Sequence, residues 1–212
     1  MAKYCFEHLT QPESQQVSGP IQDDEALFLY SIVRGKRIER ILEVGGLQAY
    51  SARNFLKAME CVKGMLYTVD LDPVNTLAEN HKVIQKNVLD LTSKDVDNQP
   101  IELVFFDCHD MVQMDTYYKF VSEGIINDDT IIALHDTNLH YPPYSMEGIP
   151  VIGEFGLAHQ PVERTMVNAF KQMGYDVFLL HTKPNKHHAS FPYRHGIAIC
   201  QKFMPLAEIE DK

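Results

Sequence analysis

Short apolar runs recur along the chain and alternate with stretches of helical periodicity. The runs lack the apolar–polar alternation of a half-exposed sheet, so they predict strands that are covered on both faces. A repeated order of strand, helix and strand favours right-handed parallel crossovers in a doubly wound sheet. The predicted strands of this kind are Arg40–Val44, Met65–Val69, Lys82–Gln85, Ile101–Phe106 and Thr130–Leu134.

Helical patterns fill most of the intervals between these strands. We expect helices from Ala26 to about Arg37, over Ser51–Met59, from Pro73 to about His81, over Met114–Glu123, and from Pro161 to a stop at Gly174. Two last apolar runs, Asp176–Leu180 and Gly196–Cys200, are joined without a helix and predict an antiparallel pair. The expected fold class is α/β, with a doubly wound, mostly parallel seven-stranded sheet and an antiparallel C-terminal strand.

The charge balance argues against nucleic acid as a partner. The 212 residues include 19 Lys plus Arg against 29 Asp plus Glu, a net charge of −10, whereas binding to a phosphate backbone needs basic patches. No run approaches the roughly 20 apolar residues of a membrane helix, so no membrane contact is expected. Residues 1–37 comprise an N-terminal segment and a helix, without the basic start and apolar stretch of an export signal. We therefore expect a cytoplasmic protein with reduced cysteines.

Acidic side chains accompany the ends of four predicted strands. Glu43 lies at the end of the first, Asp70 follows the second, Asp107 follows the fourth and His135-Asp136 follows the fifth. Ligands of an open parallel sheet bind beyond the carboxyl ends of its strands, so these groups are expected to converge on one crevice. Their mutual repulsion would cost stability unless a ligand or a cation offsets it.

The first two strand ends favour an adenosine cofactor that carries a positive charge. Gly45 and Gly46 allow the backbone to approach a ligand closely, and an acid such as Asp70 accepts hydrogen bonds from ribose hydroxyls. The turn lacks the G-x-G-x-x-G pattern of a pyrophosphate site, and Glu43 would repel a phosphate. A sulfonium fits these residues better.

The segment Glu43–Ala52, EVGGLQAYSA, resembles motif I of class I S-adenosylmethionine (SAM) methyltransferases. It is most similar to the catechol O-methyltransferase group, where E-x-G-x-x-x-G-Y-S is typical. Asp70 matches the ribose-binding acid of that family. Phe106-Asp107 and Leu134–Thr137 resemble the metal-bearing strand ends of the group and of its bacterial cousins, the sugar O-methyltransferases and cephalosporin-hydroxylase-like proteins. The resemblance covers roughly residues 38–138 and implies a Rossmann-like fold.

The resemblance implies one methyltransferase-like domain over residues 1–212, which would methylate a hydroxyl of a small-molecule acceptor. SAM is the expected cofactor, assisted by a divalent cation, Mg²⁺ first and Mn²⁺ or Fe²⁺ as alternatives. The expected cofactor-binding residues are Glu43, Gly45, Gly46, Ser51, Asp70, Asn87 and Asp107. The expected metal ligands are Asp107, His135 and Asp136, and the expected catalytic residues are His109, as general base, and Asp110.

Several positions depart from the family pattern. Ala49 replaces the usual last glycine of motif I. Asp110 stands where the catechol group has a lysine base and the sugar enzymes have a histidine. His135 stands where the sugar enzymes usually have glutamate, and Thr137 stands where the catechol group has asparagine. Both the metal and the base are therefore open at the level of the sequence.

Other interpretations of the same residues also stay open. Asp107 and Asp136 are typical of helix caps or solvated loop acids as well, and His109 and His135 of core histidines. A cofactor-binding protein without catalysis, or a metal-dependent hydroxylase or hydrolase, could carry the same cluster. Residues 139–160 are long for a loop and predict a lid over the acceptor. A homodimer is compatible with the sequence.

Overall fold

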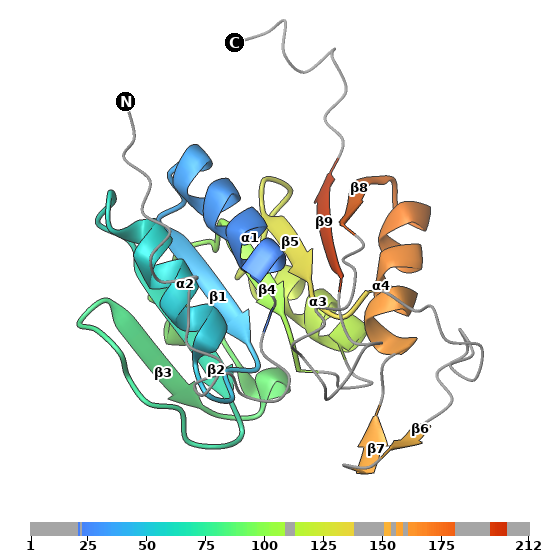
Figure 1. Ribbon diagram of the computed structural model, residues 1–212, viewed down its shortest axis with the longest axis horizontal. Helices are drawn as coiled ribbons and strands as arrows, with labels where there is room; N and C mark the ends of the chain where they lie inside the picture. Colours follow the sequence, from blue (N-terminus) through green and yellow to red (C-terminus); the bar gives the residue numbers. More distant parts are fainter. Residues whose placement is uncertain are drawn as a thin grey trace, which may run out of the picture.

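Seven strands form one sheet at the centre of the molecule (Figure 1). The structure, a computed structural model, describes residues 21, 23–108, 113–137, 151–153, 156–158, 161–180 and 196–202. The strand order is β3-β2-β1-β4-β5-β9-β8. These strands are β1 (Arg40–Val44), β2 (Met65–Asp70), β3 (His81–Gln85), β4 (Leu103–Phe106), β5 (Ile131–Leu134), β8 (Tyr175–Leu180) and β9 (Ile197–Lys202).

The sheet is parallel through its first five strands and mixed at one end. Strands β3, β2, β1, β4 and β5 pair in parallel, whereas β9 is antiparallel to both β5 and β8. The predicted fold class, a mostly parallel seven-stranded α/β sheet with an antiparallel C-terminal strand, is confirmed. The chain order of the strands reverses between β1 and β4, the place where open sheets of this kind bind ligands.

Helices cover both faces of the sheet (Figure 1). Helices α1 (Asp23–Lys36) and α2 (Tyr50–Met59) pack on one face, and α3 (Gln113–Ser122) and α4 (Pro161–Gln172) on the other. Two short 3₁₀ turns, Val88–Asp90 and Ser93–Val96, lie between β3 and β4. Because successive side chains of a strand face opposite sides, Ile41 and Phe105 join the α1 and α2 layer, while Leu42 and Phe106 join the other.

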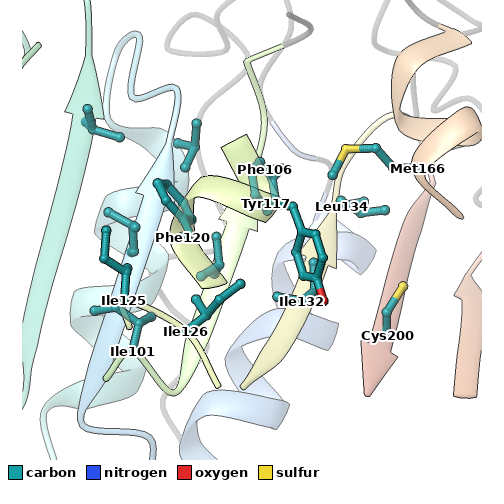
Figure 2. Close-up of a cluster of buried hydrophobic side chains, with 14 of the residues drawn as sticks. Ile101, Phe106, Tyr117, Phe120, Ile125, Ile126, Ile132, Leu134, Met166 and Cys200 are labelled. Atoms are coloured by element: carbon teal, nitrogen blue, oxygen red, sulfur yellow. The ribbon is translucent and has the colours of Figure 1, made fainter. Parts of the chain in front are cut away.

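The core on the α3 and α4 side fixes the strands whose ends carry the polar residues (Figure 2). Phe106 of β4 stacks on Phe120 of α3 with ring centroids 6.2 Å apart. Tyr117 of α3 meets Phe170 of α4 edge to face at 5.0 Å. Each such side chain stabilises the fold by about 1.5–3 kcal/mol on burial, so this layer holds the ends of β4 and β5 in place.

The helix predicted from Pro73 to about His81 is wrong. Residues 73–80 form no helix, and His81 is the first residue of β3. In a helix the backbone N–H of Leu77 would bond the carbonyl of Pro73, but here it donates to Nδ1 of His81 at 3.1 Å. A side-chain acceptor has replaced the helical hydrogen bond.

A short antiparallel pair lies within the segment that the sequence predicts to be a lid. Strand β6 (Val151–Gly153) pairs with β7 (Gly156–Ala158). Residues 138–150, 154–155 and 159–160 lie outside the described residues, so the lid stays a prediction. In the part of the chain that the structure describes, no helix has the length and apolar character needed to cross a membrane.

The end of α1 gives a stability test that is independent of any function. Arg37 is exposed with φ 58°, and the N–H of Ile38 bonds the carbonyl of Val33 at 3.0 Å. This left-handed conformation costs about 1–2 kcal/mol for residues other than glycine. We expect Arg37→Gly to raise the free energy of unfolding by about 0.5–1 kcal/mol in urea denaturation, once the greater entropy of an unfolded glycine is subtracted.

Lys36→Gly is the matched control for that variant. Lys36 is exposed like Arg37 but still belongs to the helix. Glycine at a helical position should lower the free energy of unfolding by about 0.5–1 kcal/mol. A loss of stability in both variants would contradict the left-handed geometry at Arg37.

Candidate functional site

The turn after β1 brings the backbone of Gly45 against the end of β4. Gly45 has φ +94°, which side chains disfavour, and a Cβ on it would lie 2.6 Å from the carbonyl oxygen of Asp107. Glycine is needed here on both counts. Ala49, at the position of the family's last glycine, is buried and adopts φ 59°. It therefore keeps the backbone of a glycine at a conformational cost.

Asp70, the last residue of β2, holds this turn. Its Oδ2 accepts hydrogen bonds from the backbone N–H groups of Gly46 at 2.7 Å and Leu47 at 3.1 Å. Its Oδ1 accepts one from the N–H of Asp72 at 3.0 Å. Three backbone donors thus fix the carboxylate at the edge of the sheet. An ionised carboxylate has about four acceptor positions, so capacity remains for a ligand hydroxyl.

A cavity of about 140 Å³ lies beside the turn, at the carboxyl ends of neighbouring strands. Lys86 is part of the cavity lining, and its Nζ is paired with Oδ1 of Asp95 at 2.8 Å. Because of this ion pair, the positive charge of Lys86 does not strongly oppose a cationic ligand. Apolar walls with a few converging polar groups are the usual lining of a small-molecule site. The lining residues are Val44, Gly45, Val69, Asp70, Leu71, Lys86, Asn87, Val88 and Cys108.

Glu43 lies behind the turn and is not among the residues that line this cavity. It is fully buried, and its carboxylate accepts hydrogen bonds from Ser51 and, at 2.6 Å, from Oγ1 of Thr68. Oγ1 of Thr68 also lies 2.9 Å from Nε2 of His81. Because Nδ1 of His81 accepts the Leu77 N–H, we assign the ring proton to Nε2, which donates to Thr68.

Burial governs the protonation of this network. It lowers the pKa of His81, which favours the neutral ring. Burial also raises the pKa of Glu43 to about 8, outweighing the hydrogen bonds from Ser51 and Thr68. Near pH 7 Glu43 therefore holds a proton, and its immediate role is to join β1, β2 and α2.

His135 follows β5 and lies between two carboxylates. Ile131 and Ala133 belong to the α1 and α2 layer, so strand alternation also directs His135 towards α1. Its Nδ1 lies 2.8 Å from Oδ1 of Asp107, and its Nε2 lies 3.1 Å from Oε2 of Glu25 in α1. His135 is thus a buried histidine, as one alternative predicted, but carboxylates engage both of its nitrogens.

Asp107, His135 and Asp136 form one cluster at the ends of β4 and β5. One ligand atom from each lies within 4.8 Å of the others. Asp136 has φ 55°, a conformation that Asp tolerates better than most residues. The left-handed turn explains how adjacent residues reach one point, since neighbours on a regular strand face opposite sides.

The residues of the cluster fit a divalent cation. Two carboxylates and an imidazole are donors that Mn²⁺, Fe²⁺, Zn²⁺ and, for the oxygens, Mg²⁺ accept. The buried hydroxyl of Thr68 donates a hydrogen bond to Glu43. By contrast, the hydroxyl of Thr137, next to Asp136, is buried without a hydrogen-bond partner among the described residues. Such a buried hydroxyl is unusual unless a water or an ion satisfies it.

The cluster also needs positive charge on electrostatic grounds. Burial alone would lower the pKa of His135, but the carboxylates of Asp136, Asp107 and Glu25 outweigh burial and hold the pKa well above its usual range. A protonated imidazole can therefore balance these acids, and a divalent ion would compete with the Nδ1 proton for the same place.

The structure brings most of the predicted site residues together in two groups. Gly45, Asp70 and Asn87 border the cavity, and Gly46 is bonded to Asp70 beside it. The predicted metal ligands Asp107, His135 and Asp136 form the cluster. Glu43 and Ser51 are bonded to each other behind the turn. His109 and Asp110 lie outside the described residues, so their catalytic roles stay predictions.

Sequence reasoning missed Glu25, Thr68 and His81. Glu25 belongs to an acidic run that is typical of a helix start, so nothing in its neighbourhood marks it out. Thr68 was detectable in principle, because it is a polar residue inside a buried strand and must find a hydrogen-bond partner. His81 was hidden by the prediction of a helix over the segment before it.

Solved methyltransferase structures share this fold. The SAH-bound methyltransferase PaMTH1 of Podospora anserina has a TM-score of 0.61 at 14% identity, covering 93% of this chain and 87% of that one. The SAH complex of a Bacillus cereus O-methyltransferase has 0.58 at 15%, covering 93% and 90%. The SAM complex of TomG, an O-methyltransferase from Streptomyces achromogenes, has 0.53 at 13%, covering 87% and 82%.

Comparison of the sequence with protein-family models and with curated proteins gives no match. At identities this low the structural likeness establishes the fold and not the activity. The Rossmann-like methyltransferase fold that the motif resemblance implies is therefore confirmed.

Glu43→Gln should remove a pH-dependent part of the stability. The folded chain keeps the Glu43 proton up to about pH 8, whereas the ordinary value is 4.5, so wild-type stability falls as the pH rises through this window. Gln stays neutral and can still bond Ser51 and Thr68. We expect the stability of the variant relative to wild type to rise by roughly 3–5 kcal/mol between about pH 5 and pH 8 in urea denaturation.

The exposed residue Glu79 offers a control for Glu43→Gln. Glu79→Gln makes the same chemical change outside the buried network and should show no comparable trend. A stability difference for Glu43→Gln that stays flat across the pH range would mean that Glu43 is ionised in the folded chain.

Proposed function

We propose that the chain is a SAM-dependent methyltransferase that acts on a hydroxyl of a small molecule with the help of a divalent cation. The observation that carries the proposal is the close approach of Gly45, which borders the cavity, to Asp107, which belongs to the cluster. A methyl donor in the cavity and an acceptor at the cluster would then be neighbours, as a one-step transfer requires. The shared fold supports this proposal.

For the donor, the cavity offers groups suited to adenosine and a sulfonium. Ribose hydroxyls would donate to Asp70, whose position the backbone of the turn already fixes. The base would lie near Asn87 and between apolar residues such as Val69 and Val88. The carboxylates of Asp70 and Asp107 near the turn favour a cationic donor over a phosphate-bearing one.

In the transfer, a bond forms between the acceptor oxygen and the methyl carbon while the bond from that carbon to sulfur breaks, and the hydroxyl proton passes to a base. A divalent ion at the cluster would lower the pKa of the acceptor hydroxyl. Asp107 and Asp136 would hold the acceptor end of the site, and His109, next to Asp110, is the proposed base. Residues 139–160 would then cover the acceptor.

Binding and turnover separate this proposal from its rivals. Calorimetry with SAM and SAH should show binding to the full chain, and a panel of phenols and sugars with Mg²⁺ or Mn²⁺ should reveal turnover. SAH binding without turnover under any metal would favour a cofactor-binding protein without catalysis. Bound iron without SAH affinity would favour a hydroxylase or hydrolase.

Asp70→Asn should weaken SAH binding. Both carboxylate oxygens of Asp70 accept backbone N–H groups, and an amide cannot accept on both sides. Hydrogen bonds to charged groups contribute about 1.5–3 kcal/mol, so we expect a loss of at least tenfold in SAH affinity by calorimetry. Asp72→Asn changes the same charge at an exposed neighbour and should stay close to wild type. Equal effects in both variants would rule out a specific role for Asp70.

Asp136→Asn should spare SAH binding and abolish metal-dependent turnover. Asn tolerates the left-handed backbone at φ 55°, so the variant removes the charge with little strain. We expect a decrease in turnover of about 100-fold or more, with SAH affinity within about threefold of wild type. Normal activity of Asp136→Asn in the presence of a chelator would refute metal assistance.

A further inference from the structure

We propose that Glu25 of α1 is a positioning residue that makes His135 a nitrogen ligand, so that the cluster takes Mn²⁺, Fe²⁺ or Zn²⁺ in preference to Mg²⁺. The inference rests on the proposed function for the presence of a divalent ion. It assigns the class of that ion. It also assigns a role to Glu25, which is 110 positions from His135 in the chain.

Glu25 is fully buried, yet both of its carboxylate oxygens have defined contacts. Oε2 lies 3.1 Å from Nε2 of His135, and Oε1 accepts a hydrogen bond from the backbone N–H of Gly196, the residue before β9. A buried carboxylate costs several kcal/mol of desolvation unless such partners compensate it. The position of Glu25 is thus set by α1, β5 and β9 together.

The contact with Glu25 decides which nitrogen of His135 faces the cluster. Glu25 is an acceptor, so the ring directs Nε2–H towards it, and Nδ1 then lies on the side of the two aspartates. Nδ1 is 2.8 Å from Oδ1 of Asp107 and 3.7 Å from Oδ1 of Asp136. Ligand atoms about 2.1 Å from a common ion lie about 3 Å apart at right angles, which these separations approach.

A carboxylate behind a histidine is the usual support of a metal-bound imidazole. Histidine ligands donate their second N–H to a carboxylate or a carbonyl, which fixes the ring and increases its basicity. Imidazole suits Fe²⁺ and Zn²⁺ best, and Mn²⁺ accepts it alongside carboxylates, whereas Mg²⁺ prefers oxygen donors and keeps its waters. The oriented nitrogen of His135 therefore gives the cluster its selectivity.

The test measures the affinities of Mn²⁺ and Mg²⁺ for the full chain by calorimetry. Wild type should bind Mn²⁺ at least about tenfold more tightly than Mg²⁺. In Glu25→Gln the amide oxygen cannot serve both His135 and Gly196, so the ring loses its fixed orientation. We expect a loss of about 10–100-fold in Mn²⁺ affinity, with Mg²⁺ affinity within about threefold, so the selectivity falls.

Asn54→Ala is the matched control. Nδ2 of Asn54 donates to the carbonyl of Ala26 at 2.9 Å, next to Glu25 in the chain, so this variant removes a hydrogen bond to α1 that involves neither Glu25 nor His135. The selectivity for Mn²⁺ should survive in Asn54→Ala. Equal losses of both ions in Glu25→Gln, or the same loss of selectivity in the control, would overturn the positioning role.

The wild-type measurements keep this inference separate from the proposed function. A wild-type chain that favours Mg²⁺, or that binds SAH and neither ion, would overturn the inference while leaving the methyl donor site intact. A chain whose Mn²⁺ affinity depends on Glu25 but that has no affinity for SAH would support the inference and refute the methyltransferase.

Discussion

The close approach of Gly45 to the carbonyl of Asp107 is the constraint on which the site depends. Val44 and Phe106 are in register on adjacent parallel strands, so the turn after β1 folds directly onto the end of β4. With no room for a Cβ between the two backbones, the cavity and the cluster share one boundary. The geometry of the sheet sets their proximity.

Two buried glutamates on the face of the sheet that α1 and α2 cover avoid an isolated buried charge in different ways. Glu43 and Glu25 are both fully buried, and an isolated charge there would cost several kcal/mol. Glu43 is neutralised by a proton, as its pKa of about 8 indicates, and is hydrogen-bonded to the hydroxyls of Ser51 and Thr68. Glu25 is satisfied by an imidazole and a backbone N–H. Of these two glutamates, Glu25 is therefore the one that contacts the cluster directly, through His135.

The sequence predicts the parts of the fold and site that depend on local pattern. Continuous apolar runs identify the buried strands, and the order of strands places Asp70, Asp107 and Asp136 at one edge. Local pattern fails where a distant side chain decides, as when His81 captures the N–H of Leu77 and prevents a helix. Local pattern does not predict the role of Glu25 for the same reason, since its partners His135 and Gly196 are far away in the chain.

The chemistry of the cluster weighs against an oxygenase on the same sheet. The facial triad of non-haem iron oxygenases uses two histidines and one carboxylate, whereas the described cluster has one histidine and two carboxylates. The cavity is also bordered by the carboxylate of Asp70, which three backbone N–H groups hold in place. An oxygenase has no need of such a group. Hydrogen bonds from these three backbone N–H groups orient the Asp70 carboxylate before any ligand binds. Such preorganisation favours the proposed nucleoside donor, because a fixed carboxylate loses little freedom when ribose hydroxyls bind to it.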